Sequence, residues 1–128
     1  MILDSSAVVA VALREPGFER LLGVMASGGA LGIGAPTLVE TTIVLSSRLG
    51  LDSRGLVNRL LFEGDVTVVP FTDAHFGTAV EAWLRYGRGR HAAALNFGDC
   101  LAYAAARVAG EPLLYTGADF SRTDIEAA

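Results

Sequence analysis

The sequence contains no lysine, one cysteine and two histidines, and each scarcity removes a class of chemistry. All 10 basic side chains are arginines, so mechanisms that need a lysine beside a phosphate or a carboxylate are excluded. The single thiol, Cys100, cannot form an internal disulfide and indicates a reducing, cytoplasmic setting. Because His75 and His91 are far apart and Cys100 has no cysteine neighbour, a zinc site is disfavoured.

The chain also lacks a long apolar run of the kind that crosses a membrane. The longest uncharged stretch, residues 21–39, contains five glycines and Pro36, so it reads as a helix end, a turn and a strand. Asp4 interrupts the apolar start, so no secretory leader is expected. The net charge of −4 argues against a protein that holds nucleic acid by bulk electrostatics alone.

The chain has enough apolar residues to form the core of one domain spanning residues 1–128, since 52% of its residues are hydrophobic. Short apolar strands alternate with helices, which predicts an α/β fold with a mainly parallel central sheet of four to five short strands flanked by helices. An alanine-rich helix near the end indicates that another element packs very close to it. We expect strands at 2–3, 30–34, 66–71 and 112–117, helices at 7–15, 16–27, 36–50, 51–64, 72–87 and 97–110, and a turn with at most a short strand at 118–125.

Four acidic residues fall at the ends of these expected elements. Asp4 follows the first strand and Asp119 follows the last, at the edge of a parallel sheet where ligands bind. Glu40 and Asp99 lie in the first turns of two helices. We therefore expect the four carboxylates to meet at the carboxyl end of the sheet.

Each acid alone has an ordinary structural explanation. Asp4 could cap a helix, Glu40 and Asp99 could complement helix dipoles, and Asp119 could hold a turn. Together they are harder to explain, because two like charges ~4 Å apart at an effective dielectric of ~20 repel by about 4 kcal/mol. Protonation or a bound cation would relieve that repulsion, and an all-oxygen ligand set selects Mg²⁺ or Mn²⁺.

Other proteins with acidic pockets fit the residues poorly. A phosphorelay receiver and a haloacid-dehalogenase-type phosphatase both need a lysine, and the latter also needs DxD where this chain has DSS. A P-loop needs GK[ST], which is absent, and GIGAPT supplies only two of the three dinucleotide-binding glycines. No nucleophile elbow supports a Ser-His-Asp hydrolase.

Four blocks of the sequence resemble the successive blocks of PIN-domain ribonucleases, and most closely the VapC toxins of bacterial type II toxin–antitoxin pairs. These blocks are MILDSSAVVAVALREPG, APTLVE, RYGRGRHAAALNFGDCLAYA and LLYTGADFSRTDI, and together they extend from residue 1 to about residue 125. Their order and spacing include all four acids. One departure from the family pattern is Ala118, where the family often has a polar or acidic residue. Asp119 is therefore the only candidate acid in the last of the four blocks.

The resemblance implies a PIN-like fold in which Asp4, Glu40, Asp99 and Asp119 form an acidic, catalytic metal site. It further implies Mg²⁺- or Mn²⁺-dependent endonucleolytic cleavage of RNA, products with a 5′-phosphate and a 3′-hydroxyl, a homodimer, and inhibition by a cognate VapB antitoxin. In such a site a divalent ion offsets phosphodiester charge and lowers the pKa of a bound water for in-line attack.

Several further side chains are candidates for supporting roles. Ser5 and Thr116 flank the acids and could hydrogen-bond a carboxylate, a metal-bound water or a phosphate, although helix capping and a strand end explain them equally well. Trp83 and Phe97 are expected in the core, whereas Tyr86 could stack on a base. A glycine-spaced segment could present guanidinium groups to RNA, or could simply be a solvated basic face, through Arg85, Arg88 and Arg90.

Two alternatives remain open from the sequence. One is a PIN-fold nuclease outside toxin–antitoxin biology, acting in DNA processing or RNA maturation. The other is a catalytically silent PIN-fold module that binds proteins, which predicts missing acids, whereas all four are in place.

Overall fold

Four short parallel strands form the centre of the computed structural model, which describes residues 1–128. The strands are β1 (Ile2–Leu3), β2 (Leu31–Gly34), β3 (Val66–Val69) and β4 (Leu113–Leu114). They lie in the order β3-β2-β1-β4, and every neighbouring pair is parallel. The α/β class and the parallel sheet predicted from the sequence are therefore confirmed.

Alternation along β1 and β4 separates the core into two parts. Ile2 and Leu113 point to one face of the sheet and pack with residues of the last two α-helices. Leu3 and Leu114 point to the opposite face, where they pack with Ile33 and the first helices. This alternation follows from the period of two in a strand, and it buries both faces of a parallel sheet.

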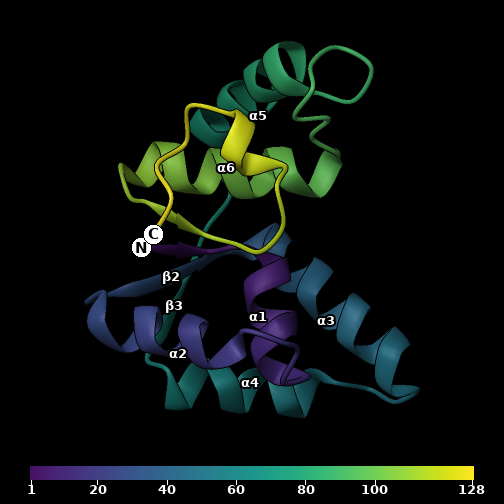
Figure 1. The fold of residues 1–128 in the computed structure, drawn as a ribbon, viewed down its shortest axis with the longest axis vertical. Helices are drawn as coiled ribbons and strands as arrows, with labels where there is room; N and C mark the ends of the chain where they lie inside the picture. Colours follow the sequence, from purple (N-terminus) through teal and green to yellow (C-terminus); the bar gives the residue numbers. More distant parts are fainter.

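Helices cover both faces of the sheet (Figure 1). On one side lie α5 (Asp73–Tyr86) and α6 (Phe97–Ala109), and on the other lie α1 (Ser5–Ala12), α2 (Phe18–Ser27) and α4 (Arg54–Glu63). Helix α3 (Ala35–Leu49) contacts both α1 and α6. None of these helices is long and apolar enough to span a bilayer.

The alanines of α6 allow it to approach the sheet closely, as the sequence suggested. Ala102, Ala104 and Ala106 are fully buried. A side chain added at Gly34, the last residue of β2, would start 3.2 Å from the methyl group of Ala105. Small residues on both elements thus bring the start of α3, which follows β2 directly, next to α6.

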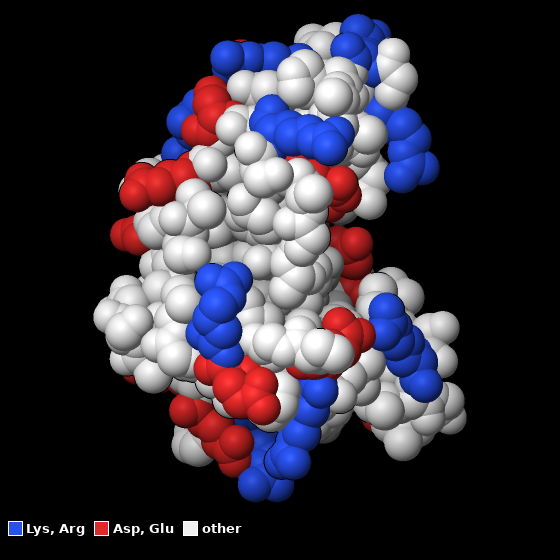
Figure 2. Space-filling view, in the orientation of Figure 1, with Lys and Arg blue, Asp and Glu red and all other residues white.

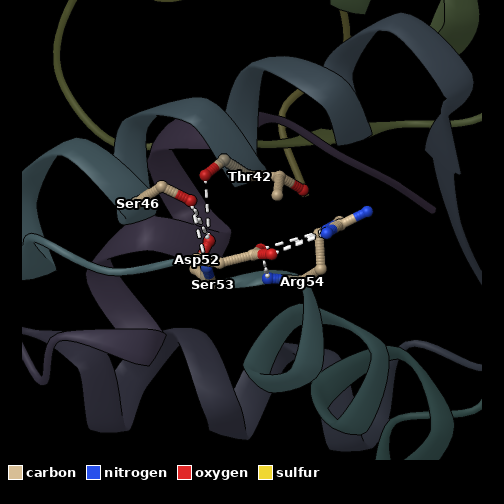
Figure 3. Close-up of polar contacts among 5 residues, drawn as sticks. All are labelled: Thr42, Ser46, Asp52, Ser53 and Arg54. Carbon is tan, nitrogen blue, oxygen red and sulfur yellow. Dashed lines mark hydrogen bonds and ion pairs between the residues drawn. The ribbon is translucent and has the colours of Figure 1, made fainter.

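A buried serine fixes the junction between α3 and α4 (Figure 3). The Ser53 hydroxyl donates to the carbonyl oxygen of Thr42 at 2.9 Å, and its backbone N–H donates to Ser46 Oγ at 3.0 Å. Beside it the exposed Asp52 and Arg54 form a bidentate ion pair, in which Arg54 Nε donates to Asp52 Oδ1 and Nη2 donates to Oδ2. The junction holds the far end of α3, the helix that carries Glu40.

Some expected boundaries were wrong. The first helix ends at Ala12, not at residue 15, and the last strand is only Leu113–Leu114. Residues after β4 form a loop and a single turn of 3₁₀-helix, η1 (Phe120–Arg122), instead of a final strand. Only an isolated bridge joins Leu113 to Ala127.

Candidate functional site

Asp4 is both a helix cap and a wall of the acidic site. It follows β1, is 4% exposed, and its backbone N–H donates to the carbonyl oxygen of Leu114 on β4 at 2.9 Å. The backbone N–H and the hydroxyl of Ser6 both donate to Asp4 Oδ2, at 3.0 and 2.6 Å. Burial raises the pKa of Asp4, the charge of Asp119 adds to the rise, and the bonds from Ser6 oppose it.

Ser6 connects this acid to the loop after β4. Its Oγ donates to Asp4 and accepts a hydrogen bond from the backbone N–H of Thr116 at 3.0 Å. Ser5, considered above either as a supporting residue or as a helix cap, makes no side-chain hydrogen bond, and Thr116 contributes its backbone N–H instead of its side chain. Ser6 could have been found in advance, because a capping side chain bonds the N–H two or three residues on.

Glu40 reaches the site from the second turn of α3. Its carboxylate lies against the first turn of α6, where any side chain at position 98 would collide with it, and Gly98 leaves that space open. Burial raises the pKa of Glu40, and the charges of Asp4 and Asp99 raise it further. No sequence pattern predicts this contact, because residues 40 and 98 belong to different helices.

Asp99 lies in the first turn of α6, where it forms a capping box with Asn96. The Asn96 N–H donates to Asp99 Oδ2 at 2.8 Å, and the Asp99 N–H donates to Asn96 Oδ1 at 2.9 Å. Burial raises the pKa of Asp99, with further contributions from Asp4 and Asp119. The hydrogen bond from Asn96 and the charge of Arg88 lower it in part.

Asp119 completes the group from the exposed loop between β4 and η1. The Asp119 carboxylate accepts no hydrogen bond and forms no ion pair. Its charge acts on both Asp4 and Asp99, and the charges of Asp4 and Asp99 act in the same way on Glu40. The four acids expected at the carboxyl end of the sheet are therefore linked electrostatically through Asp4 and Asp99.

The donor chemistry of this group fits a hard divalent cation. Asp4 and Asp99 each use Oδ2 for a protein hydrogen bond, and neither has a protein partner at Oδ1. No three acids are arranged as a ready-made cage. Mg²⁺ is commonly held by one or two carboxylates with water completing its shell, so such an arrangement is compatible with it.

The three candidate RNA-binding arginines have different surroundings. Arg88 acts electrostatically on Asp99, and the Arg90 guanidinium lies 4.2 Å from the centre of the Trp83 ring. Arg85 forms an ion pair with Asp124. Basic side chains project from the upper part of the molecule, and acidic atoms line the notch below it (Figure 2). Tyr86 is 6% exposed, which is too buried for the base stacking considered above.

Comparison with known proteins shows which family the chain belongs to. The PIN domain family model matches residues 1–126. The chain belongs to the VapC family of PIN-domain ribonucleases. Its relatives include ribonuclease VapC36 of Mycobacterium tuberculosis, which is 44% identical over 98% of this chain and 91% of the relative. Another is a ribonuclease VapC of Mycolicibacterium smegmatis, 39% identical over 99% of this chain and 98% of the relative.

Solved VapC structures share the fold. Mycobacterium tuberculosis VapC20, described as a sarcin-ricin loop cleaving toxin, superposes with a TM-score of 0.79 at 21% identity, covering 99% of this chain and 97% of that one. Rickettsia felis VapBC2, solved bound to a fragment of promoter DNA, gives a TM-score of 0.70 at 15% identity, covering 98% and 94%. At these identities the likeness supports the PIN fold alone.

The VapC fold of this chain leaves an apolar surface exposed, and it includes two residues expected in the core. Phe97 is 80% exposed and Trp83 is 43% exposed, so the expectation that they are core residues is wrong. They line a cavity of about 470 Å³ between α5 and α6, together with Phe71, Phe76, Ala79, Val80, Cys100 and Leu101. We call these eight residues the α5–α6 apolar face.

Proposed function

We propose that this chain is the endoribonuclease toxin of a VapBC-type pair, that its PIN-like domain spans residues 1–128, and that it acts in the cytoplasm. The observation that carries the proposal is the convergence of Asp4, Glu40, Asp99 and Asp119 at the carboxyl end of the sheet. Burial and mutual repulsion raise the pKa of three of them, which is the electrostatic state that a bound cation relieves. Relatives named as VapC ribonucleases support the same assignment.

Each acid has a distinct task in this proposal. Asp4 and Asp99 would be the principal ligands of Mg²⁺ or Mn²⁺, since each has an Oδ1 free of protein partners. Glu40 and Asp119 would hold water at the ion, position the attacking water, or help hold a second ion. When bound, the ion supplies charge neutralisation at the phosphodiester and a more acidic water.

Further groups would orient the site and its RNA substrate. Ser6 holds Asp4 with its Oδ2 turned toward α1, and Asn96 does the same for Asp99 at the start of α6. The charge of Arg88 acts on Asp99, and Arg88 would meet a phosphate that enters the site. Arg90 adds a second guanidinium on the same loop, while Arg85 is engaged by Asp124.

An antitoxin of the VapB type is the proposed inhibitory partner. Four clustered carboxylates attract an arginine or lysine, which could pair with them in place of the metal. The Rickettsia felis neighbour is a VapBC assembly, which supports a partner of this kind. In the proposed complex a basic side chain of the antitoxin lies among the acids and blocks RNA.

A second copy of the chain is the proposed occupant of the α5–α6 apolar face. Phe76 is 65% exposed, and with Trp83 and Phe97 it forms a contiguous aromatic surface, which is typical of an interface. Because Phe97 is two residues from Asp99, the face adjoins the acidic site. The homodimer expected from the family would therefore place its two acidic sites beside the shared interface.

Expression in a bacterial host tests the proposal as a whole. Induced wild-type chain should arrest growth and fragment cellular RNA, and co-expression of the antitoxin should relieve both effects. Asp4→Asn should leave growth and RNA intact at equal protein level. The matched control Asp52→Asn, which removes an exposed carboxylate far from the site, should remain toxic. Equal toxicity of Asp4→Asn and wild type would contradict the proposal.

A further inference from the structure

Asp124 occupies an ionic cluster outside the acidic site. Tyr103 on α6 donates its hydroxyl to Asp124 Oδ1 at 2.7 Å. Arg85 on α5 donates to Oδ2 at 3.1 Å, and Arg107 on α6 forms a second ion pair with the same oxygen. Three donors from two helices thus hold both oxygens of one carboxylate, a stronger arrangement than a single exposed ion pair.

The groups around Asp124 favour its ionised form. Burial alone would raise the pKa of Asp124, but the hydroxyls of Tyr103 and Tyr86 and the charges of Arg107 and Arg85 lower it overall. Burial and the bond to Asp124 raise the pKa of Tyr103 to about 12, so the phenol keeps its proton and remains a donor. The cluster is therefore a charged carboxylate held by donors at neutral pH.

Asp124 lies five positions after Asp119, whose carboxylate has no hydrogen bond or ion pair and whose backbone carbonyl accepts only from the Arg122 N–H, at 3.4 Å. Several contacts fix the segment between Asp119 and Asp124. Phe120 is 2% exposed and packs on Tyr115 with ring centres 5.1 Å apart. Arg122 Nη1 donates to the carbonyl oxygen of Ala92 at 3.0 Å. This C-terminal segment passes over α6 (Figure 1).

Helix α6 carries both the site and the clamp. Asp99, Tyr103 and Arg107 follow one another at intervals of four residues, so they lie along the same side of the helix. Asp99 belongs to the acidic site, whereas Tyr103 and Arg107 bind Asp124. One rigid helix thereby sets the distance between Asp99 and the segment that presents Asp119.

We propose that Asp124 is a positioning residue that holds the 116–123 segment so that Asp119 faces Asp4 and Asp99. This inference rests on the proposed metal site, but it concerns a residue outside that site. It also gives Arg85 and Arg107 a defined role, as donors of the clamp. Residues that orient metal ligands from outside the ligand set commonly change metal affinity or activity by about 10–100-fold when removed.

The test compares Asp124→Asn and Tyr103→Phe with wild type and with Asp52→Asn, the matched control that removes an exposed, arginine-paired carboxylate elsewhere. Amide hydrogen exchange without metal reports the order of residues 116–123. Titration calorimetry with MgCl₂ reports ion affinity, and cleavage of a defined RNA reports activity. Tyr103→Phe removes one donor and keeps the two arginines, so it remains informative if Asp124→Asn unfolds.

We expect both cluster variants to exchange faster at residues 116–123 while β1, α1 and α3 stay protected as in wild type. Mg²⁺ affinity and cleavage rate should each fall by about tenfold in Asp124→Asn and by less in Tyr103→Phe. Wild-type exchange in both variants, or faster exchange spread over the whole chain, would overturn the proposal. If wild type cleaves no RNA, the function is wrong, yet the exchange and Mg²⁺ measurements still decide the role of Asp124.

Discussion

The carboxylate of Glu40 lies in the space that a side chain at Gly98 would occupy. Helix α3 therefore places its acid directly against the first turn of α6, one residue before Asp99. Because position 98 has no Cβ, the Glu40 carboxylate can lie against the helical turn that carries Asp99. The glycine is a structural requirement of the site even though its backbone is helical.

Gly98→Ala should lower RNA cleavage without lowering the stability of the fold. Alanine favours a helix over glycine by about 0.5–1 kcal/mol, and the displaced group is the flexible end of Glu40, so the fold should persist. Displacing Glu40 by ~1 Å could reduce RNA cleavage by about 100-fold. Urea unfolding and cleavage assays check both effects. Gly77→Ala on α5, where a Cβ meets nothing within 4 Å, is the control that should keep full activity. Full activity of Gly98→Ala would show that Glu40 is not needed where it lies.

Ser6→Ala should shift the pH dependence of cleavage. The two bonds from Ser6 lower the pKa of Asp4 against the effect of burial, and the substitution removes the hydroxyl bond. The pKa of Asp4 then rises, so its ionised form appears only at higher pH. The acidic limb of the pH–rate profile should therefore shift to higher pH in Ser6→Ala, whereas Ser5→Ala should leave it in place. An unchanged limb in Ser6→Ala would mean that Asp4 ionisation does not limit the reaction.

Asp99→Asn should stabilise the metal-free protein near neutral pH. Because the folded-state pKa of Asp99 is raised, the folded state binds more protons than the unfolded state above pH ~4. The stability contribution of Asp99 is thus present at low pH and is lost as pH rises through the folded-state pKa. In EDTA we expect the variant to melt about 2–4 °C higher at pH 7 and to differ less at pH 5. A lower melting temperature at pH 7 would contradict this electrostatic explanation.

Phe76→Glu should dissociate the proposed homodimer. The substitution puts a charge into the α5–α6 apolar face, where a second copy would bury it. Light scattering should report a dimeric wild type and a monomeric variant. Phe62→Glu is the matched control, since Phe62 is 87% exposed on α4 and lies outside that face. A dimer that survives Phe76→Glu and is lost in Phe62→Glu would place the interface on the other side of the sheet.

Much of the fold could be predicted because its signals are local. The β-branched run of β3, the proline at the start of α3 and Gly50 and Gly110 at helix ends each fix a boundary within a few residues. The four acids were also identifiable, since Asp4 and Asp119 follow strands that end at the same edge of the sheet. The structure shows Asp4 as the cap of α1, and this capping role is compatible with the site role proposed for it.

The contacts that tune the site could not be predicted, because they join residues distant in sequence. Gly98 meets Glu40 across two helices, and Asp124 is held by donors 17–39 residues away. Trp83 lies on α5 and Phe97 begins α6, and only the structure shows that the two line one apolar surface that nothing within the chain covers. Helical periodicity predicts that a face is apolar, without identifying what packs on it.

Cleavage of a defined RNA by purified protein tests the central claim most directly, that the four acids form one divalent-metal nuclease site. Wild type should cut with MgCl₂ or MnCl₂, leave 5′-phosphate ends, and stop cutting in EDTA. Asp4→Asn and Asp99→Asn should be inactive at any Mg²⁺ concentration while folded by circular dichroism, and Asp52→Asn should match wild type. Cleavage that persists in EDTA, or in a nuclease-free preparation of either site variant, would contradict the account.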